Sequence, residues 1–117
     1  MEGFRGLKVY QKAYALSLEI HRQSLNFPKH EQFELAAQIR RASKSVVLNI
    51  VEGYGKNSSA TEFKRYLTIA RGSCDEVRAQ FDYCKDLGYI SEAEHTSYEQ
   101  RYQEIGKMLT GMIKKWQ

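Results

Sequence analysis

Basic side chains are the groups in this sequence best suited to binding chemistry. From Gln38 to Gly72 the chain has seven basic residues against two acids, a net charge of +5. Lysines and arginines on consecutive helices can neutralise backbone phosphates, and the resulting affinity falls as the salt concentration rises. The predicted nucleic-acid-binding residues are Arg40, Arg41, Lys44, Lys64, Arg65 and Arg71.

The charge distribution also supports a different interpretation. From Ser73 to Gly106 there are eight acids against three bases, a net charge of −5. The basic stretch of one copy could therefore meet the acidic stretch of the next copy, as in a structural scaffold. Charge reversal at Arg40 and Arg41 would then dissociate the assembly as well as weaken any RNA binding.

A second set of polar residues recurs at helical spacing. Gln38, Arg41, Ser45, Asn49 and Glu52 follow one another at steps of three, four, four and three, so they share one helix face. Such a face can form a hydrogen-bonded network with another helix, although a solvated face is the plainer alternative. The predicted polar seam between subunits or helices consists of Gln38, Ser45, Asn49, Glu52, Gly53, Gly72, Ser73 and Glu76.

Gly72 supports the seam, because glycine within a helix costs about 1 kcal/mol relative to alanine. That cost predicts a close backbone approach at this position.

Residues for catalysis or metal binding do not form a recognised pattern. The three histidines, His21, His30 and His95, lie on different segments, and the Glu92 to His95 spacing supplies a single Glu-x-x-His pair. No catalytic residue, metal site or cofactor is therefore predicted. His21 is expected in a partly buried tyrosine-rich line. An enzyme or ligand-binding bundle would instead need a buried pocket around it.

The cysteines and the apolar runs indicate a cytoplasmic protein with no membrane partner. Cys74 and Cys84 fall in one predicted helix with Cα atoms about 15 Å apart, too far for a disulfide, so we expect reduced core thiols. No apolar run approaches the roughly 20 residues that span a bilayer, and the N-terminus lacks an apolar secretory segment.

Four helical segments are expected to position these residues. They cover about 7–25, 31–54, 59–87 and 91–116, joined by short turns. The predicted fold is an all-α, antiparallel up-down-up-down four-helix bundle, formed as a single domain by residues 1–117. The first helix carries two adjacent apolar lines, both expected to be buried: Leu7, Tyr10, Tyr14, Leu18, His21 and Leu25, beside Val9, Ala13, Leu16 and Ile20.

Local signals mark where the helices begin and end. Ser59 with Glu62 and Ser91 with Glu94 have the spacing of capping boxes, which predicts two helix starts. Gly55 is expected as a left-handed cap of the second helix, and Gly88 as the centre of a Schellman-type stop.

Two stretches of the sequence resemble a bacterial family, and the likeness extends over nearly the whole chain. They are residues 38–55, with the pattern Arg-Ala-x-x-Ser-x-x-x-Asn-Ile-x-Glu-Gly, and residues 66–76; the opening 4–13 and the turn 87–90 also fit. The family is the small four-helix bundle proteins first noticed as products of intervening sequences in large-subunit ribosomal RNA genes. The resemblance implies a homopentamer shaped as a tapered barrel with a central channel.

A relative in this resemblance is the accessory variability protein of diversity-generating retroelements, a basic pentamer that binds nucleic acid and a reverse transcriptase. The resemblance thus implies a non-enzymatic, homo-oligomeric accessory protein that contacts RNA or RNA–DNA hybrid. The alternative is a scaffold that binds another protein, such as a reverse transcriptase. One departure from the family pattern is Val47, where members often have proline, so we expect a straighter second helix.

Overall fold

The computed structural model describes residues 3–115, and this range contains helices and turns but no strand. The helices are α1 (Lys8–Ser24), α2 (Leu35–Gly55), α3 (Ala60–Asp86) and α4 (Glu92–Lys115), with short 3-10 helices η1 (Gly3–Gly6) and η2 (Lys29–Glu31). The predicted all-α class with four helices is therefore confirmed. Trp116, the last residue of the predicted fourth helix, lies outside the described residues.

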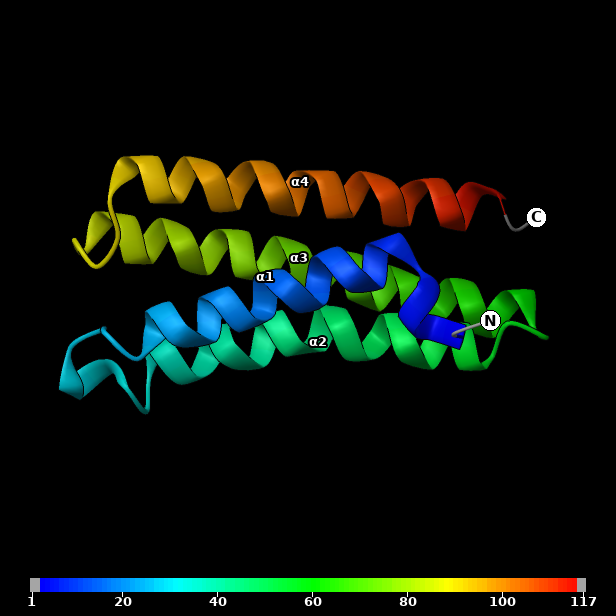
Figure 1. Ribbon diagram of the computed structural model, residues 1–117, viewed down its shortest axis with the longest axis horizontal. Helices are drawn as coiled ribbons and strands as arrows, with labels where there is room; N and C mark the ends of the chain where they lie inside the picture. Colours follow the sequence, from blue (N-terminus) through cyan, green and yellow to red (C-terminus); the bar gives the residue numbers. More distant parts are fainter. Residues whose placement is uncertain (1–2, 116–117) are drawn as a thin grey trace.

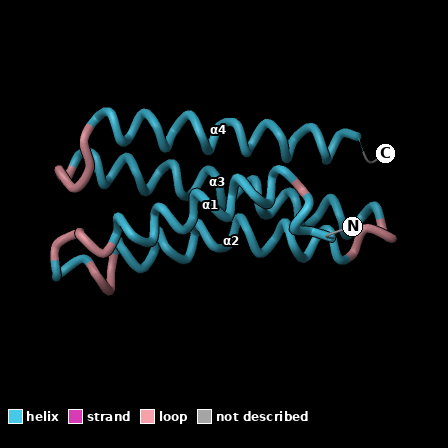
Figure 2. Tube along the Cα trace, in the orientation of Figure 1, coloured by secondary structure: helices cyan, strands magenta, loops and turns pink. Residues whose placement is uncertain are grey.

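The four helices lie side by side along a molecule that measures 44 × 23 × 21 Å. Figures 1 and 2 show the α1–α2 and α3–α4 connections at one end and the α2–α3 turn at the other. α2 packs against α1 and α3, and α3 packs against α4, whereas α1 and α4 share a smaller contact. Where two connections meet at one end, the Tyr89 hydroxyl donates to Glu31 Oε2 at 2.8 Å.

The core forms along apolar lines that face the inside of the bundle. Buried lines on α2, α3 and α4 contribute about 1.5–3 kcal/mol for each large aliphatic side chain removed from water. They include Ile39, Val46, Ile50, Leu67, Val77, Phe81, Ile105 and Leu109.

The first helix buries one of its two apolar lines. Val9, Ala13, Leu16 and Ile20 form the buried line. The prediction for the other line is wrong beyond its first turns, because its later members are exposed. α1 packs mainly against α2, and this stripe lies along the outer edge of that contact, where no other described helix covers it. These exposed residues are Tyr14, Leu18, His21 and Leu25, and no buried pocket surrounds His21 among the described residues.

The second helix begins four residues later than the predicted start at Glu31. A 3-10 turn, η2, occupies Lys29–Glu31, and α2 starts at Leu35. Gln32 explains the delay, because its side-chain amide donates to the carbonyl oxygens of Ser24 and Phe27, both at 2.9 Å. Those bonds hold Gln32 against the end of α1 and keep it in the connection. Val47 lies within α2, which continues unbroken through that position.

Both predicted capping signals lie at helix starts. Ser91 and Glu94 form the complete box, since the Glu94 N–H donates to Ser91 Oγ at 3.0 Å and the Ser91 N–H donates to Glu94 Oε1 at 2.8 Å. Ser59 accepts from the Glu62 N–H at 3.3 Å, but the Ser59 N–H donates to the Lys56 carbonyl instead of to Glu62. The Ser59–Glu62 capping box therefore has only one of its two hydrogen bonds.

The predicted Schellman stop at the end of α3 is confirmed, and the glycine cap of α2 is not. Gly88 has φ +82°, its N–H donates to the Lys85 carbonyl, and the Tyr89 N–H donates to the Cys84 carbonyl at 2.8 Å. Gly55 does not have a positive φ and forms the last residue of α2. The turn after it is made by ordinary backbone conformations at Lys56, so glycine is not required there.

Both cysteines are buried and free, as predicted. Cys74 and Cys84 lie on the inner face of α3. Burial raises the pKa of Cys74 to about 12 and that of Cys84 to about 12, so both stay as thiols at neutral pH.

Two tyrosines one turn apart on α4 provide a prediction about stability. Tyr98 and Tyr102 are both buried, but Tyr98 donates its hydroxyl proton to Gln23 Oε1, whereas the Tyr102 hydroxyl has no hydrogen-bond partner among the described residues. A buried hydroxyl without a partner costs about 1–3 kcal/mol. We therefore expect Tyr102→Phe to raise the free energy of unfolding by about 1 kcal/mol, and Tyr98→Phe to lower it by about the same amount.

Urea unfolding followed by circular dichroism compares the two variants with the parent chain. A loss of stability in Tyr102→Phe as large as that in Tyr98→Phe would contradict the prediction, since it would reveal a bond to the Tyr102 hydroxyl.

Candidate nucleic-acid interface

The six basic residues predicted to bind nucleic acid do not share one surface. Arg40 lies between α2 and the end of α1, where it bonds within the chain. Its Nη1 donates to Ser24 Oγ at 2.7 Å, and its Nη2 donates to the Gln32 carbonyl at 2.9 Å. Arg40 therefore joins α1, η2 and α2, and its guanidinium is engaged in the fold.

Arg65 is exposed but is already paired. Its Nη2 lies 3.1 Å from Glu62 Oε1, and its guanidinium lies over the Tyr66 ring at 4.4 Å from the ring centre. Exposed pairs of this kind contribute little to stability, so Glu62 weakens the attraction of Arg65 for phosphate without abolishing it.

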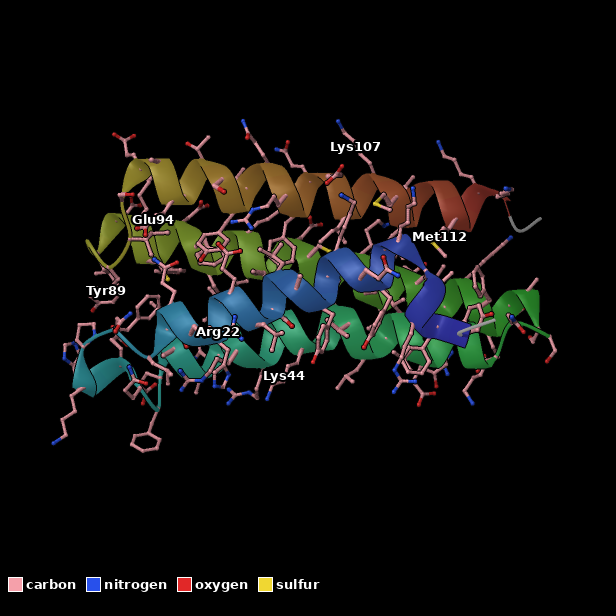
Figure 3. The ribbon with its side chains drawn as sticks, viewed as in Figure 1. Arg22, Lys44, Tyr89, Glu94, Lys107 and Met112 are labelled. Carbon is pink, nitrogen blue, oxygen red and sulfur yellow. The ribbon has the colours of Figure 1, made fainter. Side chains whose placement is uncertain are left out.

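Arg41 and Lys44 lie on the outer face of α2. Both are exposed, and neither forms an ion pair or side-chain hydrogen bond with another described residue. In Figure 3 Lys44 lies on the α2 side of the bundle, whereas Lys107 projects from the opposite side, on α4. A phosphate chain that follows one helix face cannot reach both lysines in one copy.

Lys64 and Arg71 lie on the side of α3 that faces α4. Arg71 lines an open groove of about 430 Å³ between these helices, and its Nη1 donates to Thr110 Oγ1 at 3.3 Å. Lys64 lies two helical turns before Arg71. We call this feature the α3–α4 groove, and its lining residues are Arg71, Asp75, Arg78, Tyr102, Gln103, Gly106, Lys107 and Thr110.

The charges in the α3–α4 groove are unevenly balanced. Arg78 is neutralised, because its Nη2 lies 2.6 Å from Glu99 Oε2 and its Nη1 lies 3.1 Å from Asp75 Oδ1. The Arg78 hydrogen bond lowers the pKa of the Glu99 carboxyl, so this pair stays charged through neutral pH. Arg71 and Lys107 have no acidic partner within residues 3–115, which leaves two positive charges on the groove.

Half of the predicted polar seam is assembled between α2 and α3. Ser45 and Ser73 share a hydrogen bond of 2.8 Å between their hydroxyls, and Asn49 donates to the Ser45 carbonyl at 2.9 Å. Gly53 lies at a close approach of the two helices, since a Cβ added there would lie 3.2 Å from Tyr66 Cβ. The Ser45–Ser73 bond and the Gly53 contact join two helices of the same chain, whereas Asn49 bonds to Ser45 within α2.

The other seam residues lie outside this contact. Gln38, Glu52, Gly72 and Glu76 are exposed. A Cβ added at Gly72 would meet nothing within 4 Å, so the close approach predicted at this glycine does not occur within the chain. Glu52 lies 4.0 Å from Lys56 Nζ, and Glu76 accepts from Gln80 at 3.3 Å.

Lys107 is the groove residue that the sequence interpretation did not include. It lies directly after the stretch of net negative charge that ends at Gly106, so neither of the two charge counts included it. The useful signal was the seven-residue interval between Lys107 and Lys114, which places both on one side of a helix.

The described helices define an all-α protein of four packed helices whose polar and cationic groups lie on open helix faces. The model of the family described as "23S rRNA-intervening sequence protein" matches residues 5–111, so the chain belongs to that family. The resemblance inferred from the sequence motifs is thereby confirmed.

A crystal structure of a protein of unknown function from the S23 ribosomal protein family, from Bacteroides thetaiotaomicron VPI-5482, has a similar fold. The TM-score is 0.82 at 24% sequence identity, over 91% of this chain and 95% of that chain. A search of curated proteins gave no match. Among the described residues, no helix has the length and apolar character needed to cross a bilayer.

Proposed function

We propose that this chain is a non-enzymatic, homo-oligomeric accessory protein that binds the phosphate backbone of RNA or RNA–DNA hybrid. In this proposal the antiparallel bundles assemble as a pentameric barrel, as the family resemblance implies. The observation that carries the binding is the pair of cations on the α3–α4 groove, Arg71 and Lys107, which have no acidic partner among the described residues.

The shape of the groove supports contact with a backbone rather than with a small ligand. It is open and runs between two helices that lie side by side, so a chain of phosphates can pass along it. Lys64 continues the positive charge beyond Arg71 on α3. Each phosphate neutralised by a cation releases counterions, which supplies affinity that depends on salt and not on sequence.

The family name links these proteins to intervening sequences in 23S ribosomal RNA genes, which favours a nucleic-acid context. The proposal retains Lys64 and Arg71 from the predicted set and adds Lys107. Arg40 contributes to the fold instead, since its guanidinium is bonded to Ser24 and Gln32.

Charge reversal in the groove tests the proposal. We expect Arg71→Glu/Lys107→Glu to weaken binding of a structured RNA about tenfold or more at 50 mM salt and to reduce the salt-dependence slope by about two. The matched control is Lys29→Glu/Lys85→Glu, which changes the net charge equally at the end of the bundle that holds two connections. Filter-binding titrations at two salt concentrations measure both.

Equal losses in the groove variant and in the control would show that general charge, and not the groove, drives binding. Absence of RNA binding by the parent chain at 50 mM salt would exclude the function itself.

A second candidate function is a scaffold that binds another protein, such as a reverse transcriptase, without contacting nucleic acid. The observation that favours it is the number of large apolar side chains on the surface of α1, α2 and α3. Co-purification of a protein partner by a chain that does not bind RNA would support this alternative.

A further inference from the structure

The outer face of α1 and α2 contains a groove of about 230 Å³ that is more apolar than the α3–α4 groove. We call it the α1–α2 groove. Its walls include Tyr14 and Leu18 from α1 and Leu48 from α2, and Leu48 is 60% exposed. Exposed apolar side chains that gather in one groove, as these three do, indicate a surface that another molecule covers. The residues that line it are Tyr14, Ser17, Leu18, His21, Lys44, Val47 and Leu48.

The α1–α2 groove is also positively charged. Lys44 lies on its wall, and Arg41 is one turn earlier on the same helix. No carboxylate lines the groove, and neither cation has an ion pair among residues 3–115. An occupant that fits this surface therefore combines apolar side chains with negative charge.

The outer face of α3 has that combination. Ile69, Gly72, Glu76 and Tyr83 follow one another at steps of three, four and seven, so they lie on one side of the helix. All four are exposed, and Tyr83 is 65% exposed. We call these residues the α3 stripe.

Gly72 gives the α3 stripe a feature that the single chain does not explain. A glycine in the interior of a helix costs about 1 kcal/mol relative to alanine, and no atom of residues 3–115 occupies the space above it. A side chain from a neighbouring molecule packed over Gly72 would use that space.

We infer that the α3 stripe of one copy docks into the α1–α2 groove of the next copy, with Glu76 facing Lys44. This inference rests on the proposed homo-oligomer and names the two surfaces that form it. Leu48 packs over Gly72 beside Ile69, and Tyr83, about 16 Å further along α3, extends the contact. Because the two surfaces differ, the contact is head-to-tail, and repetition of one such contact generates a closed ring when the rotation closes.

The test uses variants at exposed positions, which leave the fold intact. We expect Leu48→Glu and Gly72→Leu each to raise the subunit dissociation constant about a hundredfold or more, measured by sedimentation equilibrium. Phe33→Glu is the matched control, because Phe33 is 92% exposed but lies in the connection before α2 and on neither surface, and it should leave assembly unchanged. Unchanged circular dichroism of each variant verifies the helices.

Charge exchange provides a second measurement. Lys44→Glu and Glu76→Lys should each weaken assembly, whereas the double variant Lys44→Glu/Glu76→Lys should restore it to within about threefold of the parent chain. A parent chain that stays monomeric at all concentrations would refute the oligomer of the proposed function. An oligomeric parent whose assembly is insensitive to Leu48→Glu, Gly72→Leu and the charge variants would overturn only the docking inference, as would equal dissociation by Phe33→Glu.

Discussion

Substitution of Gly53 by valine is expected to lower the free energy of unfolding by about 3 kcal/mol, the largest effect we predict for a single residue. A Cβ at this position would lie 3.2 Å from Tyr66 Cβ and 3.3 Å from the Phe63 carbonyl oxygen. Both atoms belong to or adjoin the α3 backbone, so they cannot move aside without separating the two helices. The two γ-methyl groups of valine add to the overlap.

Gly72→Ala is the control that separates packing from helix propensity. It changes a glycine in the interior of α3 where an added Cβ meets nothing, so we expect it to raise the free energy of unfolding by about 1 kcal/mol. Thermal unfolding at one low protein concentration measures both variants, since assembly would raise the apparent stability. A valine at position 53 that left the melting temperature unchanged would contradict the close contact between α2 and α3.

Arg40→Met is expected to lower the free energy of unfolding by about 2 kcal/mol, with a fall in melting temperature of about 8 °C. Methionine retains most of the aliphatic stem but has no donors for Ser24 Oγ and the Gln32 carbonyl, which accept from Arg40 at 2.7 and 2.9 Å. Ser24 is fully buried, so water does not replace the lost donor.

Arg41→Met provides the matched comparison, because Arg41 is adjacent in sequence but exposed and without a partner among the described residues. Its effect on stability should be within about 0.5 kcal/mol. Similar losses in the two variants would contradict the structural role of Arg40. The contrast also bears on the scaffold hypothesis, since charge reversal at Arg40 would disturb the fold before it reported on assembly.

The sequence predicted the parts of the fold that depend on contacts between residues close together in the chain. The Ser91–Glu94 box and the Gly88 turn are local arrangements of backbone and side chain, so their residue types are sufficient to place them. The exposed line of α1 was mispredicted because apolar spacing defines a face but not the helix that covers it. Tyr14 and Ile20 look equally suited to a core until the direction of α2 is known.

The candidate interface was harder to predict than the fold, because residues that are adjacent in sequence point in different directions around a helix. Arg40 and Arg41 are adjacent in sequence but about 100° apart around α2, so one joins the α1 end and the other faces outward. A charge count over a segment treats them as one patch. The two glycines also could not be told apart from the sequence. Both lie in helix interiors, and only the packing of α2 against α3 shows that Gly53 is in close contact and Gly72 is open.

The reactivity of the two sulfhydryl groups on the inner face of α3 can report when this helix separates from its neighbours. Thiol reagents attack the deprotonated sulfur, and at neutral pH both sulfurs are protonated and shielded from solvent. Alkylation at Cys74 or Cys84 therefore requires α3 to separate transiently from its neighbours. The rate of reagent uptake measures how often that happens, at the middle of the helix for one cysteine and near its C-terminal end for the other.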